Sequence, residues 1–105
     1  RTIYRDGERI IARTYPPSAV AADAVEQTVL AFLREVNAAA SAKGILPDPI
    51  RGTVGVIEGA EFYGLVHELS TQSGAVIMSA YANGDTDAMG PLRLTFRIES
   101  RGTSS

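Results

Sequence analysis

Side chains able to do chemistry are few in this sequence, and His67 is its only histidine. The surrounding apolar residues Phe62, Leu65, Val66 and Leu69 recur at helical spacing. At 100° per residue, His67 points about 140° away from Phe62 and therefore off the apolar face. A solvated histidine with no serine or carboxylate partner in a recognisable pattern is a poor general base. We predict an exposed, dispensable His67 and no catalytic residue.

A second candidate is the acidic loop NGDTDAMG, in which Asn83, Asp85 and Asp87 alternate as they do at the start of a calcium loop. That motif requires glycine at its sixth position and glutamate at its twelfth, and these positions hold Ala88 and Leu94. We interpret the segment as a polar loop and predict no metal site. The chain has no cysteine, which removes thiolate catalysis, disulfides and thiolate-bound metals.

Basic residues recur in the closing segment, where Arg93, Arg97 and Arg101 share one face that Glu99 interrupts. Such a face could bind an anion or a partner. The net charge is −2, however, and the chain contains neither a phosphate-binding glycine loop nor the stacking aromatics of RNA-binding strands. We therefore predict no nucleic-acid partner and no cofactor.

The elements that position these residues begin with TIYRDGERIIARTY, which favours a hairpin turning at Asp6-Gly7, with Ile3 opposite Ile10. A long helix is predicted over 19–43, with Ser18 as its N-cap and Gly44 as its left-handed stop. Its apolar stripe consists of Val25, Val29, Phe32, Leu33 and Val36.

The second half of the chain predicts a strand at 53–58, a helix at 62–73 and strands at 75–82 and 92–99. Glu58 and Glu61 precede and open the second helix, where carboxylates favour the helix dipole. The unit from Thr53 to Tyr81 should be a right-handed crossover between parallel strands. The predicted core consists of Val29, Phe32, Val36, Leu65, Leu69, Val76, Leu94 and Phe96.

The predicted fold class is α+β: a two-layer ferredoxin-like sandwich with an N-terminal hairpin and two helices packed on one face of a mixed sheet. One domain should fill the whole chain of 105 residues. Within it we expect the hairpin at 1–15, the ferredoxin-like core at 19–100 and a flexible tail at 101–105.

The run from IRGTVGVIEG to LRLTFRIES resembles the periplasmic domain of PilO and GspM proteins, which belong to the inner-membrane platforms of type IV pilus and type II secretion machines. That family has a strand, a short glycine-to-aromatic entry, an amphipathic helix, a strand, a variable loop and a closing alternating strand. Here the entry is Gly59 to Phe62. The sequence departs from the family in its N-terminal hairpin and in having one strand between the helices.

The resemblance implies a non-enzymatic scaffold that acts as a homodimer or as a heterodimer with a sister platform subunit. It also implies a periplasmic location, with a membrane anchor or signal peptide upstream of Arg1, since no apolar run here reaches the roughly 20 residues that span a bilayer. Two other functions remain open: a small-molecule-binding or regulatory domain, and a small enzyme with its site between subunits. So does a cytoplasmic location. The expected contact residues are Ile3, Tyr4, Ile11, Arg93, Thr95 and Arg97.

Overall fold

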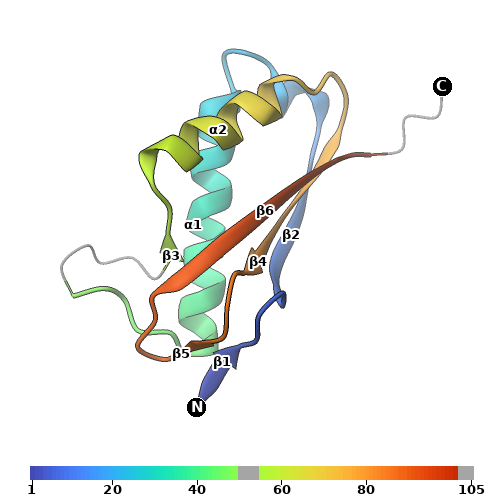
Figure 1. Cartoon of the computed structure of the whole chain (residues 1–105). Coiled ribbons are helices and arrows are strands. Elements are labelled where there is room, and N and C mark those ends of the chain that lie inside the picture. Colours follow the sequence, from blue (N-terminus) through green and yellow to red (C-terminus); the bar gives the residue numbers. More distant parts are fainter. Residues whose placement is uncertain (50–54, 102–105) are drawn as a thin grey trace.

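The computed structural model describes residues 1–49 and 55–101, with the side chains of 55 and 56 left aside. Two α-helices, a short 3-10 helix and six strands follow one another along these residues (Figure 1). Their order is β1 (Thr2–Tyr4), β2 (Arg9–Tyr15), η1 (Pro17–Val20), α1 (Val25–Lys43), β3 (Gly55–Val56), α2 (Gly59–Ser70), β4 (Val76–Ala82), β5 (Thr86–Asp87) and β6 (Leu92–Ser100).

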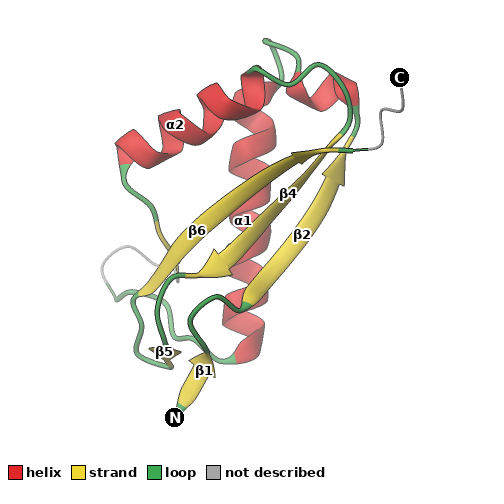
Figure 2. Cartoon of the chain, turned by 45° about the vertical axis from the view of Figure 1, so that its right-hand side comes forward, coloured by secondary structure: helices red, strands yellow, loops and turns green. Residues whose placement is uncertain are grey.

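The main sheet has the strand order β2-β4-β6-β3. β4 runs antiparallel to both of its neighbours, and β3 pairs with β6 in parallel. A second, two-stranded sheet joins β1 to β5. Figure 2 shows β6, β4 and β2 side by side, with α1 crossing behind them. The predicted fold class, an α+β two-layer sandwich of ferredoxin-like type, is confirmed.

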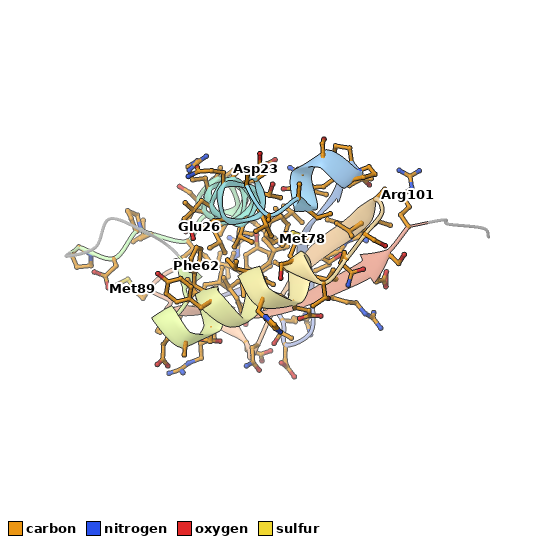
Figure 3. All side chains as sticks on the ribbon, turned by 90° about the horizontal axis from the view of Figure 1, so that it is seen from above. Asp23, Glu26, Phe62, Met78, Met89 and Arg101 are labelled. Atoms are coloured by element: carbon orange, nitrogen blue, oxygen red, sulfur yellow. The ribbon has the colours of Figure 1, made fainter. Side chains whose placement is uncertain are left out.

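One core holds both helices against the inner face of the sheet. α1 contributes Val29, Phe32 and Val36, all buried as their helical spacing predicts. Figure 3, seen from above, places Met78 of β4 among the side chains between α1 and α2. Of the predicted core, only Phe96 is half-buried rather than buried. No helix within the described residues is both long and apolar enough to cross a membrane.

The long helix begins later than predicted. Instead of continuing from Ser18, the chain forms η1 and then extends at Ala21 (φ −62°, ψ 153°) before α1 starts at Val25. This break lets Val20 reach the core, and the Thr28 hydroxyl donates to the Ala19 carbonyl (2.7 Å), which ties η1 to α1. The other end matches the prediction, because Gly44 is left-handed (φ 118°) after Lys43.

The predicted N-terminal hairpin is wrong, although its turn exists. The Glu8 N–H donates to the Arg5 carbonyl (2.9 Å), and Gly7 has the positive φ (81°) that favours glycine. The flanking strands then diverge: β1 joins β5 and β2 joins β4, so Ile3 does not face Ile10. The cause is the end of β4, where Ala82 exchanges backbone hydrogen bonds with Gly7 and Glu8 and draws the turn onto the main sheet.

The predicted parallel crossover is also wrong. β6 lies between β3 and β4, and β4 runs antiparallel to it while β3 runs parallel. The start of that unit, Thr53, lies outside the described residues. α2 begins three residues before the predicted Phe62, because the Glu61 carboxylate accepts the Glu58 N–H (3.2 Å) and caps the helix.

Beyond β6, most of the predicted tail (102–105) lies outside the described residues. Its first residue, Arg101, still donates its N–H to the Ala75 carbonyl (2.9 Å). The antiparallel ladder between β4 and β6 therefore extends one residue past the strand.

Candidate functional site

His67 lies on the exposed side of α2, as its angular position predicts. Its backbone carbonyl accepts the Ser70 hydroxyl (2.6 Å) at the last turn of the helix, a contact that does not involve the imidazole. Exposure leaves the imidazole without the buried neighbours that orient a general base.

The carboxylates of the acidic loop accept hydrogen bonds from backbone N–H groups. Asp85 accepts the Asp6 N–H and Asp6 accepts the Gly84 N–H, each at 2.8 Å, so the loop and the turn clasp each other. Asp87 accepts the Met89 N–H (2.9 Å) within the loop. Across residues 1–49 and 55–101, no three His, Cys, Asp or Glu side chains are grouped to hold a metal ion.

A buried tyrosine anchors the N-terminal strand beneath α1. Tyr4 is only 2% exposed, and the Lys43 ammonium lies 4.2 Å from its ring centroid. Lys43 also pairs with the Glu8 carboxylate at 2.5 Å. The hydrogen bond from Lys43, and then that from the Arg5 N–H, lowers the pKa of Glu8, whereas burial raises the pKa of Tyr4. The cluster is a fastening between β1, the turn and the end of α1.

The two edges of the main sheet differ: β2 forms one, and the other is formed by β6 beyond its short pairing with β3. The edge at β2 is the closed one. Every second residue of β2 exchanges backbone hydrogen bonds with β4: Ile11 with Ala80, Arg13 with Met78 and Tyr15 with Val76. The groups of β2 that face outward therefore belong to Ala12 and Thr14.

Arg13 covers that edge. Its Nη1 donates to the Ala12 carbonyl (2.9 Å), and its Nε pairs with Glu35 of α1 (2.6 Å). A bulge between Arg9 and Ile11 interrupts one end of the strand, and Pro16 follows the other. Inward-directed charges, bulges and prolines are the devices by which proteins prevent unwanted strand pairing.

β6 presents the open edge. The bonds from Asn83 to the Arg93 carbonyl and from Arg101 to the Ala75 carbonyl set the alternation, so its odd-numbered residues bond to β4. Its even-numbered residues direct their N–H and C=O groups the other way. β3 pairs with β6 only at Leu92 and Arg93. Beyond that pairing, no strand within the described residues lies on this edge, so the outward groups of three residues remain unpaired there: Phe96, Ile98 and Ser100.

The six predicted contact residues differ in their exposure and do not lie on one surface. Arg93, Thr95 and Arg97 lie exposed together on the outer face of β6, whereas Ile3 lies half-buried on β1 in the other sheet. The remaining two, Tyr4 (2% exposed) and Ile11 (8%), belong to the core and offer no contact surface. Only the β6 half of the predicted surface is therefore accessible in this chain.

A shallow hollow of about 380 Å³ lies at one end of the outer sheet face. It is lined by Tyr81 of β4, by Thr95 and Arg97 of β6, and by the turn at Asp6. The structure places Tyr81 in this hollow and leaves Tyr63 exposed on α2.

The family model described as the DUF3084-associated C-terminal helical hairpin matches residues 4–104. No curated protein and no solved structure matches the chain. The family description mentions only helices, and the structure adds to its two helices a four-stranded sheet and a two-stranded one. Because the match spans nearly the whole of the sequence, the chain belongs to the DUF3084-associated C-terminal helical hairpin family.

Proposed function

We propose that this domain is a non-enzymatic assembly module that joins a partner chain through the open edge of β6. The proposal rests on the row of unpaired outward backbone groups from Phe96 to Ser100. A strand added to such an edge gains main-chain hydrogen bonds, while alternate side chains provide specificity. The opposite edge, at β2, is closed by Arg13. A further strand can therefore be added at the β6 edge but not at the β2 edge.

The roles of the polar side chains support an assembly function over catalysis. The carboxylates of the acidic loop bond to backbone N–H groups, and Lys43 fastens Glu8 beside Tyr4. These residues hold the fold together in the free chain. They are therefore not arranged around a reacting group.

The setting of the assembly comes from the resemblance to PilO and GspM domains. It supports a periplasmic module of a pilus or secretion platform, tethered to the inner membrane by a segment outside this chain. The family description, which calls the module C-terminal and associated with another domain, fits a binding unit carried by a larger protein. The partner in this proposal is a second copy or a sister subunit.

The test is a pair of proline variants on the two edges. Ile98→Pro removes an N–H that faces away from β4, so the internal ladder keeps its hydrogen bonds while the open edge loses a donor. Thr14→Pro removes the equivalent outward N–H of β2. Light scattering should show a dimer for the native chain and for Thr14→Pro, and a monomer for Ile98→Pro. The proposal is contradicted if the native chain stays monomeric at high concentration and binds no sister subunit.

The hollow beside Tyr81 favours a second candidate, a domain that binds a small anion. Its volume falls within the range of about 300 to 1,000 Å³ that is usual for ligand sites, and Arg97 supplies a positive charge. Calorimetric titration with small dicarboxylates and phosphates would test it. Binding that is lost in Arg97→Ala and kept in Arg93→Ala would favour this function over assembly.

A further inference from the structure

The open edge of β6 also restricts how a partner can pair with it. We propose that the partner is a second copy of this chain, and that the two β6 strands pair antiparallel about a twofold axis that passes beside Ile98. This inference rests on the proposed function and specifies its partner and register. It follows from the backbone alternation, the outer-face charges and the apolar side chains along the edge.

The backbone alternation admits only a few symmetric registers. Leu94, Phe96, Ile98 and Ser100 direct their N–H and C=O groups outward, so a second copy must set even-numbered residues opposite even-numbered ones. Within the strand, the axis can then pass beside residue 96, 97 or 98. Each choice brings a different set of outer-face side chains together.

Two of these registers are unfavourable. An axis at 97 sets Arg97 against the same arginine of the second copy, and like charges directly opposite one another repel. An axis at 96 would match Arg93 with Glu99 of the second copy. That position is already taken, because β3 pairs with Leu92 and Arg93 on the same edge.

An axis at Ile98 places opposite charges against each other on the outer face. It sets Arg97 opposite Glu99 of the second copy, and symmetry makes that contact twice. Both are non-hydrogen-bonded positions, where facing side chains lie closest. Within one chain, the Arg97 Nε lies 3.5 Å from the Glu99 Oε1, and the two side chains are 65% and 49% exposed. An ion pair this exposed is weak, so each side chain can pair with the second copy instead.

The inner face of the edge also gains from this register. Phe96 and Ile98 are only half-buried in the single chain, although both point toward the core. Ile98 would meet its own copy across the axis, and Phe96 would face Ser100 of the second copy.

Cysteine pairs test the register directly, because the native chain contains no cysteine. A mixture of Arg97→Cys and Glu99→Cys proteins should form a disulfide-linked dimer under mild oxidation, since these positions face each other at about 4.5 Å between Cα atoms. Each variant alone should cross-link at least about tenfold more slowly, because its cysteines would be diagonal neighbours. Rapid cross-linking of Arg97→Cys alone would place the axis at 97 and overturn the proposal.

Charge reversal gives the second readout. Arg97→Glu and Glu99→Arg should each raise the dimer dissociation constant by roughly tenfold or more, and the double variant should restore it. Arg93→Glu, with the same charge change on the same face, is the matched control and should have little effect. A native dimer that lacks this cross-link and this rescue overturns the register and leaves the assembly function standing. A native monomer overturns both.

Discussion

The two edges of the main sheet, one along β2 and the other along β6 beyond its pairing with β3, differ in how their outward backbone groups are covered. β2 has Arg13 on its edge, with one nitrogen on the Ala12 carbonyl and another on Glu35. β6 has nine residues, of which seven (94–100) pair with β4 in an unbroken register, and among the described residues no such cover lies on its other edge beyond the pairing with β3. Edge protection is therefore local: one arginine, one bulge and a proline close an edge that backbone geometry alone leaves open.

The largest effect is expected where the core joins the two edges. The ring of Phe32 lies edge-on to Tyr15 of β2 (centroids 6.5 Å apart) and to Phe96 of β6 (6.3 Å). Phe32→Ala should cost about 3 to 5 kcal/mol of unfolding free energy, measured by urea denaturation. Phe62→Ala, at a half-buried position, should cost clearly less. A loss below about 1 kcal/mol for Phe32→Ala would show that α1 packs on another face.

The next largest effect is expected when the edge of β2 is uncovered, which removes the difference between the two edges. Arg13→Ala frees the Ala12 carbonyl and leaves Glu35 unpaired, so the chain should form species larger than a dimer at high concentration. The stability loss should stay within about 1 kcal/mol, because the ion pair is partly exposed. Arg9→Ala, on the outer face of the same strand, is the control and should leave the particle size unchanged. Native-like size for Arg13→Ala would show that Arg13 does not guard this edge.

A smaller effect is expected at Tyr15, whose buried hydroxyl has no hydrogen-bond partner within the described residues. Burial, and then Glu35, raises its pKa. Above about pH 10 the unfolded tyrosine ionises before the folded one, so stability is lost as the pH rises through that range. Tyr15→Phe should stabilise the fold by about 1 kcal/mol at neutral pH and should reduce that alkaline loss. Tyr63→Phe, at an exposed position, should change neither. A destabilised Tyr15→Phe would reveal a partner for the hydroxyl.

The smallest effect is expected at His67. His67→Ala removes an exposed side chain, so the unfolding free energy and the self-association should stay within about 0.5 kcal/mol of native values. Thermal unfolding and light scattering provide the two readouts. A large change in either would give His67 a role in the fold or the interface.

Periodicity was enough to predict the layers of this fold. The apolar stripe of α1 and the alternation of β6 follow directly from residue spacing, and so do the exposed position of His67 and the stop at Gly44. These features depend on neighbours a few residues apart. Local spacing therefore carries the information needed to predict them.

The edges could not be predicted in the same way. β1 and β5 have three and two residues, too few for a period. They pair across a long stretch of sequence, and the bond between Asp6 and Asp85, 79 residues apart, lies just beyond both strands. The contact of Arg13 with Glu35 depends on how α1 crosses the sheet. Which groups of β6 face outward depends on its pairing with β4, since a shift of one residue reverses them.

Amide hydrogen exchange measured by NMR, from low micromolar to millimolar protein, tests the central claim most directly. Exchange reports each backbone N–H separately, so the two edges can be compared in one sample. The outward amides of Phe96, Ile98 and Ser100 should become protected as concentration rises, while the outward amide of Thr14 should exchange at a constant rate. Equal behaviour at both edges, or protection at Thr14 alone, would contradict the assignment of β6 as the edge that binds a partner.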